Sequence, residues 1–288
     1  MIAARPTRAL ARALAIVLLA ALLLAHPARA ETIDVVVTQP WLALIVSFLG
    51  GPNVSVTSLQ EWGAEGELVR RKKGKKAAPL PEGALIIALD SSDAQAAGLG
   101  IDAREDVRHL YGPFPIGGAD VDASFSDPSV IPFVAQRALT ALSSWDPSNY
   151  PYYQRRLAEL QARLSSSVLA ARRVLQGVRV YDLTGSSRAL LMAAGCDIEA
   201  PDPERLKEWA KGRTAGLVEL LDERRAEGVF VVADARTPRA IRRVLAGRPG
   251  VSLLARPQMD QDWPTFLHDQ LISLWQDIEK RSAPSKRR

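Results

Sequence analysis

The stretch DPSNYPYYQRRLAELQARLSSSVLAARRVLQG, residues 146–177, decides the fold of this chain. Its spacing is that of one face of an α-helix, since apolar residues recur every three or four positions. These are Tyr153, Leu157, Leu160, Leu164, Val168, Ala171 and Leu175. Pro151 suits a first turn and Gly177 a stop, so a helix of about 40 Å is predicted from Asn149 to Gln176. A helix of that length in the middle of the chain predicts a rigid connection between two lobes.

On both sides of this helix, short β-branched runs alternate with apolar helical segments. Strands are predicted at 33–38, 54–59, 84–90, 178–183, 228–233 and 251–255. Such alternation is typical of an α/β fold in which each sheet is mostly parallel and flanked by helices. We therefore expect an N-terminal lobe over 31–145, the linker helix over 146–177 and a C-terminal lobe over 178–280. Residues 281–288 are predicted to be a disordered tail.

Residues 60–81 interrupt the pattern, because they are polar, contain glycine and carry a cluster of positive charge. The cluster consists of Arg70, Arg71, Lys72, Lys73, Lys75 and Lys76. We predict a solvated surface loop here. The alternative is a contact surface for an anionic partner.

The first thirty residues have the features of a secretory signal peptide. Three arginines precede an apolar run over 13–25, and Ala28-Arg29-Ala30 resembles a cleavage signal. The apolar run is too short to span a membrane comfortably. We expect residues 1–30 to be removed and the mature protein to be a periplasmic monomer.

The charge of the mature chain argues against nucleic-acid binding. Without the signal peptide, 33 basic residues stand against 32 acidic ones. Without the basic cluster and the basic residues of 280–288 as well, the numbers are 22 and 32. A nucleic-acid binder concentrates positive charge on its folded surface, whereas this body is acidic.

No enzyme class is indicated by the sequence. It contains no Gly-x-Ser-x-Gly elbow, phosphate-binding loop or His-Glu-x-x-His motif. The single cysteine, Cys196, permits no internal disulfide and no cysteine metal cluster.

Four segments, taken in order, resemble a known family. They are VVVTQPWLALIVSFLGGPNVSVTSL (35–59), GADVDASFSDP (118–128), DPSNYPYYQRRLAELQARL (146–164) and VFVVADARTPRAIRRVLAGRPGVSLLARP (229–257). Together they are similar to the solute-binding proteins of ABC importers for zinc and manganese. The resemblance implies two lobes on a rigid helix, a solute in the cleft between them, and an inner-membrane ABC permease as partner.

The resemblance also implies metal-ligand positions, and this chain departs from the family at each of them. The loop that should supply a first histidine contains Glu65 and Glu67 instead. The histidine of the second segment falls at Asp122, and the first ligand of the second lobe falls at Asp182. The last ligand, an aspartate in the family, falls at Arg256.

This departure predicts a site that suits hard cations better than zinc. Zinc prefers nitrogen and sulfur ligands, and the two mature-chain histidines, His109 and His268, lie in no matching position. Carboxylates suit manganese, magnesium or calcium, and Glu67, Asp122 and Asp182 would form such a site if they converged. The alternative is that these acids are solvated or cap turns.

Two further residues are predicted to lie in the cleft. At a ligand position, Arg256 would repel a cation. It is therefore expected to pair with both Asp122 and Asp182, or to bind an anionic solute. Asp234 follows a predicted strand and is a second cleft candidate. The function predicted is therefore a periplasmic binding protein with a carboxylate-rich cleft. The alternative is a non-transporting interaction protein that kept the fold and lost metal binding.

The long helix gives the first testable prediction. Leu164→Pro should lower the free energy of unfolding by about 3 kcal/mol or more, because proline removes a backbone hydrogen bond and clashes with the preceding turn. Chemical denaturation of the mature protein measures this loss. Ser165→Ala, on the polar side of the same turn, is the control and should change little. A stable Leu164→Pro variant would contradict the helix.

Overall fold

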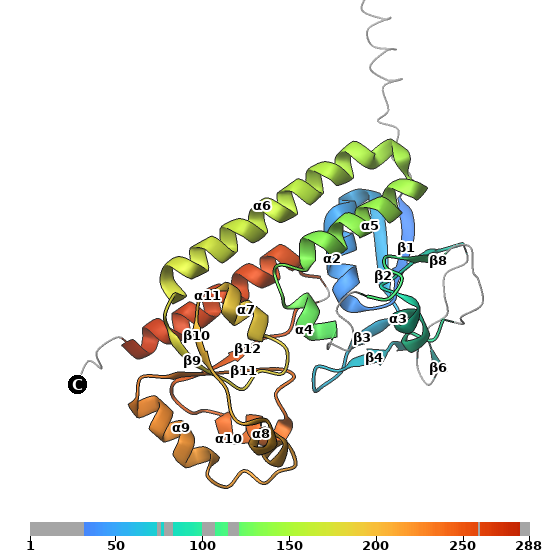
Figure 1. Cartoon of the computed structure of the whole chain (residues 1–288). Coiled ribbons are helices and arrows are strands. Elements are labelled where there is room, and N and C mark those ends of the chain that lie inside the picture. Colours follow the sequence, from blue (N-terminus) through green and yellow to red (C-terminus); the bar gives the residue numbers. More distant parts are fainter. Residues whose placement is uncertain are drawn as a thin grey trace, which may run out of the picture. The chain divides into compact units, whose positions relative to one another are not determined.

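The computed structural model describes residues 32–73, 76–77, 83–99, 107–114, 121–258 and 260–282. Two mostly parallel sheets flanked by helices precede and follow one long helix, α6 (Tyr150–Leu175), as Figure 1 shows. The predicted α/β class is confirmed. The predicted signal peptide and residues 283–288 of the predicted tail lie outside the described residues. Within the described ranges, no helix is both long and apolar enough to span a membrane.

The first sheet has the strand order β2-β1-β7-β8. Its strands are β1 (Ile33–Val37), β2 (Val54–Ser58), β7 (Leu85–Ala88) and β8 (Val107–His109). β7 pairs in parallel with both β1 and β8, and Val36 lies opposite Ile86. The helices of this part are α2 (Pro40–Gly50), α3 (Ser91–Ala96), α4 (Val121–Phe125) and α5 (Ile131–Trp145). α2 is apolar all round and almost entirely buried, as expected of a helix covered on every side.

The second sheet has the order β10-β9-β11-β12, and all three pairings are parallel. Its strands are β9 (Arg179–Asp182), β10 (Asp197–Glu199), β11 (Phe230–Asp234) and β12 (Val251–Leu254). The helices are α7 (Arg188–Ala193), α8 (Pro203–Ala210), α9 (Leu217–Ala226), α10 (Arg239–Leu245) and α11 (Trp263–Ser282). All five residues of β11 are buried, as the central position of this strand requires.

The long helix α6 follows the prediction to within one residue at each end. Six of the seven predicted stripe residues are buried; the exception is Val168, which is only partly buried, while its neighbour Ser167 is buried instead. α6 packs against α2, α5 and α11. It therefore contacts helices that belong to both halves of the sequence.

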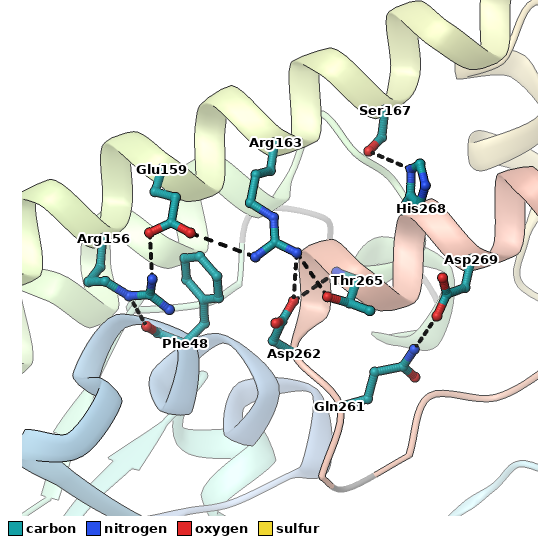
Figure 2. Close-up of polar contacts among 10 residues, drawn as sticks. All are labelled: Phe48, Arg156, Glu159, Arg163, Ser167, Gln261, Asp262, Thr265, His268 and Asp269. Carbon is teal, nitrogen blue, oxygen red and sulfur yellow. Dashed lines mark hydrogen bonds and ion pairs between the residues drawn. The ribbon is translucent and has the colours of Figure 1, made fainter.

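Arginines on α6 reinforce this packing, as Figure 2 shows. The guanidinium of Arg156 lies 3.9 Å from the ring centroid of Phe48 on α2, and its Nε donates to the Phe48 carbonyl at 2.9 Å. About two turns further along α6, Arg163 donates to the Thr265 hydroxyl of α11 at 2.9 Å. Glu159 lies between the two arginines and pairs with both. One helix is thus tied by side-chain contacts to α2 and to α11.

The prediction of a surface loop over residues 60–81 is wrong, because the described residues of this stretch form two short hairpins. β3 (Gln60–Trp62) pairs antiparallel with β4 (Leu68–Arg70), and β5 (Lys72–Lys73) pairs antiparallel with β6 (Lys76–Ala77). The tight turn at Gly63–Gly66 makes the first hairpin, because Gly66 adopts φ 83°, which glycine tolerates best. The first two residues of the predicted tail also belong to α11, which continues to Ser282.

A buried carboxylate marks the corner between α5 and α6. Asp146 accepts hydrogen bonds from the Tyr153 hydroxyl at 2.6 Å, the Ser148 hydroxyl at 2.7 Å and the Asn149 amide at 2.7 Å. Tyr153 is fully buried, so its hydroxyl needs a hydrogen-bond partner inside the protein, and Asp146 is that partner. Burial acts to raise the pKa of Asp146, but these donors outweigh it and hold the pKa below its usual value.

This corner gives a pH-dependent prediction. Because the folded pKa is lowered, the carboxylate stabilises the protein above the unfolded pKa of about 3.9, and this contribution is lost as pH falls through the folded pKa. Asp146→Asn should lower the free energy of unfolding by about 1–3 kcal/mol at pH 7, and by less below pH ~4. Urea denaturation across this pH range measures the difference. Asp260→Asn, at an exposed position, is the control; equal losses at all pH values would refute the role of the charge.

Candidate functional site

A small cavity lies where loops from both sheets meet. It is lined by residues that follow the carboxyl ends of β1, β9, β11 and β12, the edge at which open α/β sheets bind ligands. Its free space is about 30 Å³. That is room for about one or two water molecules, far below the roughly 300 Å³ of the smallest typical ligand pockets. The cavity is therefore filled almost completely by the protein's own side chains.

Asp122, on α4, is the acidic centre of this cavity. It is 3% exposed and pairs with the guanidinium of Arg236 at 2.8 Å. Its other oxygen accepts a hydrogen bond from the Trp41 indole Nε1 at 2.5 Å. A buried carboxylate is costly unless a positive charge and donors satisfy it. Arg236, two residues beyond β11, supplies that charge from the second sheet.

Aromatic rings form the wall behind Asp122. Trp41 stacks on Phe125 with centroids 5.8 Å apart and meets Trp62 edge-to-face at 5.3 Å. Phe266 of α11 also meets Trp41 edge-to-face, at 5.7 Å. The indole of Trp263, fully buried, donates to the Phe125 carbonyl at 3.3 Å. These rings exclude water from the Asp122 carboxylate and so strengthen its interaction with Arg236.

Asp234, at the end of β11, is used as a structural cap. Its carboxylate accepts from the backbone N–H groups of Gly185 and Ser186, both at 2.9 Å, and from the hydroxyls of Ser186 and Ser187. It also accepts from the Thr237 N–H at 2.9 Å. The carboxylate is 4% exposed. It lines the cavity but holds together the loops that follow β9 and β11.

Asp182, at the end of β9, is turned toward its own loop. Its carboxylate accepts from the Thr184 N–H at 2.9 Å and from the Thr184 hydroxyl at 2.6 Å. Arg188 lies 3.9 Å from its other oxygen. Burial raises the pKa of Asp182 above its usual value, although the Thr184 donors and Arg188 oppose the rise. Asp182 is not among the residues that line the cavity.

Glu67 lies in the turn of the β3–β4 hairpin, and Arg256 contacts the same turn. Glu67 is exposed and accepts from the Glu65 N–H at 2.9 Å, so it closes its own turn and does not line the cavity. Arg256 lines the cavity and donates to the carbonyl of Gly63 in the same turn. Gly66 packs so closely on Ala235 and Arg236 that an added Cβ would lie 3.1 Å from the Arg236 side chain. The β3–β4 hairpin thus contacts the second sheet's loops.

The expected convergence of Glu67, Asp122 and Asp182 is not found. Within the described ranges, no group of three or more His, Cys, Asp or Glu side chains is arranged to hold a metal ion. The expected pairing of Arg256 with Asp122 and Asp182 is wrong, because the arginine that pairs with Asp122 is Arg236. Arg236 was missed because the resemblance directs attention to the position after β12. The available signal was the sequence Asp234-Ala-Arg, which places a cation two residues past a strand end.

The basic cluster lies on the two hairpins. Arg70 donates to the Gly98 carbonyl at 3.4 Å, and Arg71 donates to the Ser58 carbonyl at 3.4 Å. Lys72 is exposed. Lys73 and Lys76 lie in β5 and β6, and Lys75 lies outside the described residues. The two arginines therefore brace the hairpins as well as contribute charge.

No family model and no curated protein match this chain. Solved structures do match it in fold. One is ZnuA, with a TM-score of 0.57 at 16% identity, over 86% of this chain and 99% of that one. A second is the SBP FpvC from Pseudomonas aeruginosa in complex with Mn²⁺, with a TM-score of 0.53 at 15% identity, over 87% and 99%.

A third is Lmb of Streptococcus agalactiae, a bifunctional protein with adhesin and metal-transporting activity. Its TM-score is 0.59 at 14% identity, over 85% of this chain and 99% of that one. All three are matched over nearly their whole length. The chain therefore has the fold of the metal-type solute-binding proteins with which its sequence segments were compared.

Proposed function

We propose that this chain is a periplasmic solute-binding protein of the metal-type ABC importer class, in which Arg236 occupies the place of a bound cation. The observation that carries the proposal is the ion pair of Arg236 with buried Asp122 at 2.8 Å. The fold shared with ZnuA and FpvC supports the general class. The partner expected for this class is a permease in the inner membrane.

Charge balance explains why an arginine at this place matters. A carboxylate buried among aromatic rings requires a positive partner, and a divalent cation or a guanidinium can provide it. Arg236 already does so without a solute. A divalent cation must therefore displace Arg236 from Asp122 before it can bind there, and it gains no help from Asp182 or Glu67, which face elsewhere.

The chemistry of the side chains that line the cavity decides which cation competes best with Arg236 for Asp122. The cavity offers carboxylate, hydroxyl and amide oxygens, and zinc prefers nitrogen and sulfur. A hard cation such as manganese or calcium suits these oxygens better. We propose weak zinc affinity and a preference for hard divalent cations, with Arg236 as the competitor.

A non-transporting interaction protein is the second candidate. The observation that favours it is that three contacts between the chain's own groups join elements around the two sheets: Asp122 to Arg236, Gly63 to Arg256 and Phe125 to Trp263. Lmb, of similar fold, has adhesin activity beside metal transport. The basic residues Arg70, Arg71, Lys72, Lys73, Lys75 and Lys76 would then contribute to the partner surface.

Calorimetry on the chelator-treated mature protein tests the first proposal. Zinc, manganese and calcium are titrated into the wild type and into Arg236→Gln, with Arg239→Gln, an exposed arginine on α10, as the matched control. The wild type should show no tight zinc binding. Arg236→Gln should lower the free energy of unfolding by about 1–3 kcal/mol. This loss is smaller than that from breaking a fully buried ion pair, because Arg236 is partly exposed. The variant should also gain affinity for manganese or calcium.

Two results would contradict the proposal. Nanomolar zinc binding by the wild type would mean that the cavity opens to a nitrogen-containing ligand set. Unchanged stability and unchanged cation binding in Arg236→Gln would mean that the ion pair does not govern the site. If Arg236→Gln is destabilised but no variant binds any divalent cation, the interaction protein is the supported function.

A further inference from the structure

A second hollow lies on the same edge of the first sheet, away from the Asp122 cavity. It opens beyond the carboxyl ends of β7 and β8 and has a volume of about 690 Å³. This volume falls within the range of about 300–1,000 Å³ typical of small-molecule sites. The backbone continues the parallel pairing here, with Leu110 N–H donating to Ala88 at 2.9 Å and Tyr111 N–H to Leu89 at 3.0 Å. These hydrogen bonds hold Leu110 and Tyr111, which line the hollow, against the end of β7.

Beside Leu110 and Pro113, the hollow is lined by side chains that can donate hydrogen bonds, one of them a cation. Ser91, Ser92, His109, Tyr111 and Arg137 line it. Among the described residues that line it, none is acidic. Three different segments supply these groups: the start of α3, the end of β8 with the residues that follow, and α5. Convergence of donors from separate segments is the arrangement that an oxyanion requires.

The carboxylate of Asp90, next to Ser91 in the sequence, forms its hydrogen bonds elsewhere. Asp90 accepts from the Asp93 N–H at 2.9 Å through one oxygen and from the Phe114 N–H at 2.9 Å through the other. It thereby holds the chain after Tyr111 against the start of α3. Both oxygens are directed to backbone donors that build the wall, and Asp90 does not line the hollow.

The principal cation is already positioned. The Arg137 guanidinium lies 5.6 Å from the centroid of the Tyr111 ring, in a cation–π contact. A guanidinium held over an aromatic face keeps its planar fork free for a bidentate oxyanion. Burial raises the pKa of Tyr111 above its usual value, although Arg137 opposes the rise, so its hydroxyl stays a donor at neutral pH.

We propose that this hollow binds a small molecule through an oxyanion group, a phosphate or a carboxylate, with Arg137 as its main contact. His109, Tyr111 and the two serine hydroxyls supply further hydrogen bonds. The site is independent of the proposed cation competition at Asp122, because no residue of the Asp122 cavity contributes to it.

Calorimetry with the full mature chain at low ionic strength tests this site. The probes are inorganic phosphate and citrate, with glucose as the uncharged comparison. Arg137→Gln should weaken anion binding about tenfold or more, because a charged hydrogen-bond partner is removed. Tyr111→Phe keeps the ring that positions Arg137 and should weaken binding less. Arg155→Gln, an exposed arginine on α6, should bind as the wild type does.

The outcomes separate the anion sources and the two sites. Binding of phosphate alone indicates a phosphorylated ligand, binding of citrate alone a carboxylate ligand, and both support the site. Arg236→Gln should bind both anions as the wild type does, because the two sites share no residue. Loss of anion binding in this variant would contradict the independence of the two sites. The proposal is overturned if neither anion binds the wild type, or if Arg137→Gln, with an unchanged thermal midpoint, binds as tightly as the wild type.

Discussion

Buried negative charge at the loop edge of two parallel sheets is the constraint on which this structure depends. Asp122, Asp182 and Asp234 are 3%, 6% and 4% exposed, and each needs donors because water does not reach it. Asp234 is satisfied by backbone and hydroxyl groups of the loop after β9, and Asp182 by Thr184. Asp122 is different, because its partner is a guanidinium from the other sheet. Local loops satisfy two of the acids, and only Asp122 requires the two sheets' elements to meet.

That requirement accounts for the parts that surround Asp122. Arg236 can reach Asp122 only if the loop after β11 lies against α4, and the close packing of Gly66 on Ala235 and Arg236 holds that loop from the hairpin side. The aromatic rings of Trp41, Trp62 and Phe125 fill the remaining space. The same packing leaves about 30 Å³ free, so a solute larger than an ion needs the hairpin to move.

The parts predicted from sequence are those whose signal is local and periodic. α6 was found because its burial follows a period of 3.6, and the six strands because each is a short run rich in β-branched and apolar residues. β8 and β10 were missed, since three residues such as Val107–His109 carry too little periodicity. The β3–β4 and β5–β6 hairpins were missed because lysine, arginine and glutamate are poor strand formers, and in the β3–β4 hairpin the pairing is favoured by the turn at Gly63–Gly66. The Asp122–Arg236 pair joins residues 114 positions apart, which no local pattern reveals.

If Arg236 takes the place of a cation, as we propose, the charge of the cavity changes with it. A site of three converging carboxylates would carry a charge near −3 and draw a divalent cation strongly. The ionisable residues that line this cavity are Asp122, Asp234, Arg236 and Arg256, two of each sign. Their charges balance, so the field inside favours neither cations nor anions, and selection must come from geometry rather than from net charge. Asp234 is further withdrawn from any solute by its backbone donors. Under the proposed function, this fold is kept while one side chain lowers the affinity of the cavity for a metal ion, because Arg236 already neutralises the buried carboxylate of Asp122.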